Sequence, residues 1–157
     1  MKMRFHPALV MLFSVCLAAS GPKTIEQLKS EAAAAHGGQQ GKLYAELAHR
    51  MVDVASTQFA RNEAEKGQAT VLEILDYAAK AHDIALNTRS KMKEVEIHLR
   101  ETQRHLENMK RTLVADDRPP IDAAEKKLVA FRQDLMDEMF APKKKEHKKE
   151  EQKDEKK

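Results

Sequence analysis

The stretch from Val71 to Val114 constrains the fold of this chain more than any other. When this stretch is divided into heptads, apolar or small residues fill most of the a and d positions, which are three residues apart. The stretch contains no Pro or Gly. The first position holds Val71, Ala78, Ala85, Met92, Leu99, Leu106 and Leu113, and the second holds Ile74, Ala81, Thr88, Val95, Thr102 and Met109. This pattern predicts one spine helix over about residues 68–115, roughly 70 Å long.

Two shorter helical patterns flank the predicted spine. Residues 42–66 carry a wide apolar stripe at helical spacing, and Gly67 is expected to end that helix. A Pro pair breaks the chain after the spine, and residues 120–140 then carry a second apolar stripe. Each short helix is about half as long as the spine, so we expect one to pack on each half. The prediction is an all-α fold, an elongated antiparallel helical bundle.

Composition agrees with long solvated helices, because 34% of the residues are charged and only 4% are aromatic. The net charge of +3 comes from the first residues and from the Lys-rich end, which leaves the body between them slightly acidic. A nucleic-acid-binding face would need a basic stripe on the body, so we expect no nucleic-acid partner.

Residues 1–20 have the composition of a signal peptide. Two basic residues precede an apolar run over residues 8–19, and small residues follow up to Ser20. This order is typical of a Sec-type export signal and predicts cleavage near Ser20 and a periplasmic or secreted location. The alternative is a lipoprotein with Cys16 as its acylated first residue, although the residues before Cys16 are a poor acylation context.

The rest of the chain divides into three parts. Residues 21–41 form a leader with a short helix that begins at a capping box of Thr24 and Gln27. Residues 42–140 form the helical domain. Residues 141–157 are a Lys/Glu-rich tail without apolar residues after Ala141, so we expect it to be disordered. The tail could contact a membrane surface, but its interleaved Glu residues favour a solvated tail.

Candidate metal ligands lie on the predicted spine. His98, Glu101 and His105 project from one side of a helix at spacings of three and four residues. The two histidines are about 10 Å apart along the helix axis, too far to share one ion without a further donor. The pattern therefore favours Glu–His pairs on a solvated face, with a metal site as the alternative.

A candidate contact surface lies on the first half of the spine. Leu72, Ile84 and Leu86 widen the apolar surface there beyond what one helix over residues 42–66 would cover. An uncovered apolar patch on a soluble protein promotes association. The sequence thus predicts either a homodimer through these residues or a protein partner that binds them.

The sequence carries no motif for catalysis or for phosphate binding, so we expect no enzyme activity and no cofactor. The leading functional hypothesis is an exported, non-enzymatic interaction protein, serving as a scaffold, adaptor or chaperone-like surface in the cell envelope. The alternative is a periplasmic metal-binding or metal-responsive protein that uses His and Glu of the spine.

Overall fold

The computed structural model describes residues 22–142, which form five α-helices and one short 3₁₀-helix and contain no strand. The helices are α1 (Ile25–Ala34), α2 (Gly37–Ala60), α3 (Ala64–Thr88), α4 (Met92–Thr112), η1 (Ala115–Asp117) and α5 (Arg118–Phe140). The predicted all-α helical bundle is confirmed. The predicted signal peptide, and the predicted tail from residue 143 onward, lie outside the described residues.

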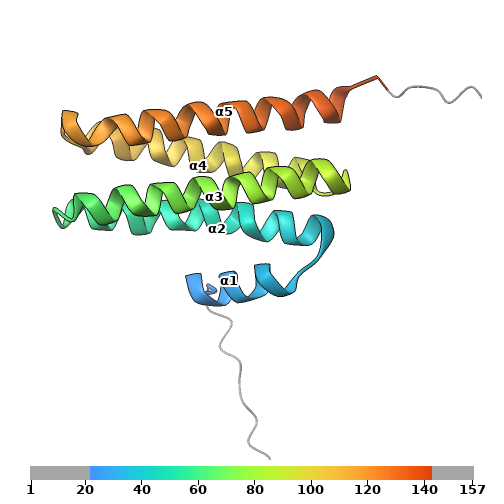
Figure 1. Cartoon of the computed structure of the whole chain (residues 1–157), viewed down its shortest axis with the longest axis horizontal. Helices are drawn as coiled ribbons and strands as arrows, with labels where there is room; N and C mark the ends of the chain where they lie inside the picture. Colours follow the sequence, from blue (N-terminus) through green and yellow to red (C-terminus); the bar gives the residue numbers. More distant parts are fainter. Residues whose placement is uncertain (1–21, 143–157) are drawn as a thin grey trace, which may run out of the picture.

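Four long helices make the bundle, and α1 lies against the outside of α2 (Figure 1). α2 packs against both α3 and α4, and α5 packs against the same two helices from the other side. Every long helix therefore has two principal neighbours. Among residues 22–142, no helix is long and apolar enough to cross a membrane.

The prediction of one continuous spine over residues 68–115 is wrong. α3 ends at Thr88 and α4 begins at Met92, so that the chain folds back on itself (Figure 1). Arg89 and Lys91 adopt left-handed backbone angles, with φ of 48° and 60°, which end one helix and start the next without Gly or Pro. Asn87, Thr88 and Ser90 at the break have low helix propensity. Folding back gives α4 two neighbours, α2 and α5, where a straight rod would have one.

The predicted limits of the first long helix are also wrong. Instead of spanning residues 42–66, the helix begins at Gly37 and ends at Ala60, and Asn62 turns the chain with a φ of 60°. Gly67 does not end a helix. It lies inside α3, where a Cβ atom would come within 2.7 Å of the Phe59 ring, so Gly67 permits close approach of α2 and α3.

α1 begins with the capping box expected from the sequence. The Thr24 hydroxyl accepts a hydrogen bond from the Gln27 backbone N–H at 3.2 Å, and the Gln27 side chain accepts from the Thr24 backbone N–H at 2.9 Å. Leu28 and Ala32 are fully buried, which fixes α1 against α2.

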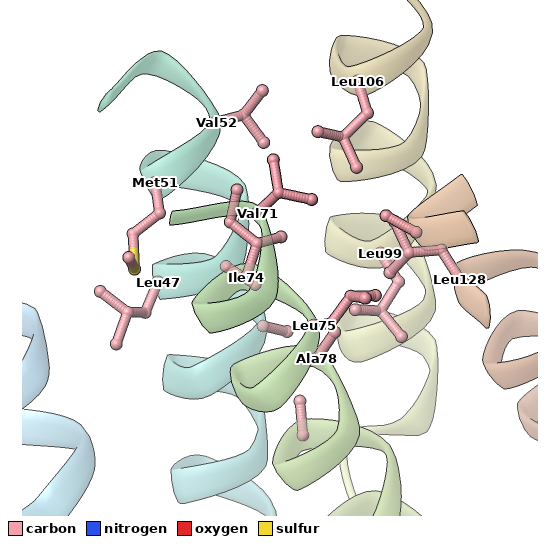
Figure 2. Packing of buried hydrophobic residues seen from close by; sticks show 14 of the residues in the cluster. Leu47, Met51, Val52, Val71, Ile74, Leu75, Ala78, Leu99, Leu106 and Leu128 are labelled. Atoms are coloured by element: carbon pink, nitrogen blue, oxygen red, sulfur yellow. The ribbon is translucent and has the colours of Figure 1, made fainter. Parts of the chain in front are cut away.

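The core runs through the centre of the four long helices (Figure 2). Leu47 points from α2 toward α1, whereas Ile74 of α3 lies beside α2. Leu99, Leu106 and Leu128 fill the side toward α4 and α5, and all five side chains are fully buried. The heptad pattern therefore identified core residues of both α3 and α4, although it joined the two helices into one.

Candidate functional site

Three histidines from two helices meet where α2 contacts α4. The ring of His49 on α2 lies 4.7 Å from the ring of His105 and 6.3 Å from the ring of His98, measured between centroids. The sequence pattern had placed His98 and His105 on one helix face and had offered no third histidine. His49 reaches them because α4 folds back beside α2.

The cluster contains nitrogen atoms that the protein itself does not use. Nδ1 of His49 and Nδ1 of His98 are buried and have no hydrogen-bond partner among the described residues. Glu101 Oε2 lies 3.7 Å from His98 Nδ1, which is close enough for electrostatic attraction and too long for a hydrogen bond. Buried polar atoms usually have a partner, so these two nitrogens are potential binding groups.

Burial is the main cause that lowers the pKa of His49, and the neighbouring His105 and His98 rings lower it further. Glu101 and Asp53 act in the opposite direction through their negative charge, each with a smaller effect on the pKa than burial. The His49 ring is therefore neutral at pH 7 and keeps a lone pair for a ligand.

The three predicted metal ligands are near one another but not preorganised. Glu101 lies between His98 and His105 in the sequence of α4, and its carboxylate approaches the ring of His98. No three His, Cys, Asp or Glu side chains in the described part of the chain already surround a point that would hold an ion. An ion at the cluster would therefore require side-chain rotation.

The three residues predicted to form a contact surface do not lie on one open face. Leu72 is 66% exposed. Ile84 faces α2, where a Cβ atom on Gly41 would come within 3.2 Å of its side chain, and Leu86 is partly buried against the core. The physical reason is that α5 also packs on α3, so α3 needs no further helix to cover most of its apolar surface.

Side-chain hydrogen bonds from Arg132 join α5 to α4. Glu96 is buried on α4, and Arg132 of α5 donates a hydrogen bond from Nε to Glu96 Oε1 at 3.0 Å. Arg132 Nη1 also donates to Gln103 Oε1 at 2.7 Å. These bonds fix the position of α4 relative to α5.

An open groove of about 420 Å³ lies between α4 and α5. Its lining residues are Gln103, Glu107, Asp122, Glu125, Lys126 and Val129. Val129 is 48% exposed and Phe140 is 81% exposed, and Met136 between them is partly buried. At 3.6 residues per turn these three side chains lie within about 40° of one another around α5. We refer to Val129, Met136 and Phe140 as the α5 stripe.

The chain was compared with protein-family models, with curated proteins and with solved structures, and none of the three comparisons gave a match.

Proposed function

We propose that this protein is an exported, non-enzymatic interaction protein of the cell envelope, acting as a scaffold, adaptor or chaperone-like protein. The observation that carries the proposal is the α5 stripe. A surface helix normally exposes polar side chains, yet Val129 and Phe140 of α5 are exposed to solvent. Large apolar side chains that share one face of a helix are typical of a contact surface.

The surroundings of the α5 stripe suit a helical partner. Val129 also lines the groove between α4 and α5, so the stripe borders a concave surface. Charged side chains at the groove, including Glu107 and Lys126, would surround an apolar contact with polar groups. An amphipathic helix laid along the groove would bury its apolar side chains against the stripe.

Export is part of this proposal because residues 1–20 have a basic start, a short apolar run and small residues before Gly21. A mature protein that begins near Gly21 would carry the whole described bundle into the envelope.

The double variant Val129→Ser/Phe140→Ser tests the α5 stripe. Both side chains are exposed, so we expect the substitutions to leave the fold intact and to change stability by less than about 1 kcal/mol. An envelope protein captured by the wild-type chain should bind the double variant about 10-fold more weakly or worse, as measured by biolayer interferometry.

Leu72→Ser is the matched control, because the exposure of Leu72 lies between those of Val129 and Phe140 but the residue is on α3. Retention of the partner by Leu72→Ser and its loss by the double variant would support the stripe. Equal binding by all three chains, or loss only with Leu72→Ser, would contradict it.

Metal binding is the second candidate function, and the histidine cluster between α2 and α4 favours it.

A further inference from the structure

We propose that His49, Glu101 and His105 bind one divalent transition-metal ion, of the class represented by Zn²⁺, at the contact between α2 and α4. This inference goes beyond the interaction function and does not depend on the α5 stripe. It rests on ring positions, on the spacing of the donors along α4, and on the unused nitrogen atoms of the cluster.

Ring separation distinguishes His105 from His98 as the partner of His49. Two imidazoles that share an ion at about 2.1 Å from each nitrogen have ring centroids about 4.5–5.5 Å apart. The His49–His105 separation of 4.7 Å falls within this range, and the His49–His98 separation of 6.3 Å does not. The separation of the His49 and His105 rings is therefore compatible with one shared ion, which the two side chains would reach by rotating a nitrogen of each ring toward it.

Glu101 supplies the third donor from the helix that carries His105. Residues four apart on a helix lie on the same face, about 6 Å apart along the axis, which allows both side chains to reach one ion. The Glu101 carboxylate already lies at the cluster, with its Oε2 3.7 Å from Nδ1 of His98. Rotation of the Glu101 side chain would bring its carboxylate to the ion and complete the three donors.

His98 is a positioning residue in this arrangement. Its Nδ1 is buried without a hydrogen-bond partner in the described structure and lies 3.7 Å from Glu101 Oε2. A small shift would let His98 donate a hydrogen bond to the carboxylate while the carboxylate binds the ion. Carboxylates that bind metals are commonly held in this way by a neighbouring donor.

The donor set selects the class of metal. Two neutral imidazoles and one carboxylate suit Zn²⁺, Cu²⁺ and Ni²⁺, whereas Mg²⁺ and Ca²⁺ prefer oxygen donors throughout. Three protein donors leave a fourth position for water. Because the donors come from α2 and α4, the ion would link these two helices.

Isothermal titration of the untagged, metal-free chain with Zn²⁺ tests the site. We expect one high-affinity ion per chain, and a Zn²⁺-dependent rise in the melting temperature because the ion binds only the folded state. His49→Gln and His105→Gln should each weaken binding at least about 10-fold, because loss of a residue that only hydrogen-bonds to a metal ligand already lowers metal affinity by about that factor. His98→Gln should weaken it less than either of them.

His36→Gln is the matched control, because His36 is exposed just before α2 and has no place in the cluster. It should bind Zn²⁺ like the wild-type chain, and so should Val129→Ser/Phe140→Ser, which separates this site from the interaction surface. NMR of the wild-type chain gives a second readout that needs no variant: Zn²⁺ should shift the ring signals of His49 and His105 but not that of His36. Absence of Zn²⁺ binding, or ring shifts confined to other histidines, would overturn the proposal.

Discussion

Leu106→Ala should lower the free energy of unfolding by about 2–5 kcal/mol, as measured by urea denaturation. Leu106 is fully buried on α4, and its side chain belongs to the core shared by the four long helices (Figure 2). Removing three carbon atoms there leaves a cavity that packed helices can close only in part. For a domain of this size, the loss is a large share of total stability.

Arg104→Ala provides the comparison, because Arg104 is exposed on α4 only two residues away. It should change the free energy of unfolding by no more than about 0.5 kcal/mol. If the two substitutions had equal and small effects, α4 would not be packed against its neighbours.

Arg132→Ala should cost about 3 kcal/mol of stability, because it leaves the buried carboxylate of Glu96 without its closest cation. The Glu96 side chain is only 9% exposed, so water cannot fully replace the lost partner. The remaining cation, Arg100, has its Nη2 4.0 Å from Glu96 Oε2, which is too long for a hydrogen bond. The Gln103 side-chain oxygen loses its donor in the same variant.

A double variant tells whether Arg132→Ala is destabilising because it leaves Glu96 unpaired or because it removes packing contacts. Glu96→Met/Arg132→Met replaces both partners by apolar side chains and should be more stable than Arg132→Ala alone, as judged by thermal unfolding followed by circular dichroism. If the double variant were the less stable of the two, the stability would come from the ion pair itself and not from avoiding a buried unpaired charge.

Much of the fold could be predicted from the sequence because the apolar spacing of each helix is regular. Most residues of the heptad pattern are buried on both sides of the break, from Val71 to Ala85 and from Val95 to Leu113. At the break itself Thr88 is exposed and Met92 is partly buried. The break itself could not be predicted, because no Gly or Pro marks it. Arg89 and Lys91 adopt left-handed backbone angles because the packing of α4 against α2 and α5 stabilises the turn between α3 and α4.

The candidate site depended on that same break. His98, Glu101 and His105 were recognised from their spacing on one helix, but His49 lies more than forty residues earlier in the chain. A continuous spine would have kept the half that carries His105 away from α2. The predicted contact surface of Leu72, Ile84 and Leu86 is not one open face for a related reason. Both α2 and α5 pack on α3 and cover part of it.

One distance measurement tests most directly whether α4 folds back along the bundle to lie beside α2 and α5. Glu73 and Asn108 are both exposed and can each be replaced by a spin-labelled cysteine. The single native cysteine, Cys16, is replaced by Ser so that only these two positions carry a label. Across a four-helix bundle, pulsed electron resonance should give a separation below about 30 Å. A continuous helix would place the labels about 52 Å apart, and that result would contradict the fold and the histidine cluster together.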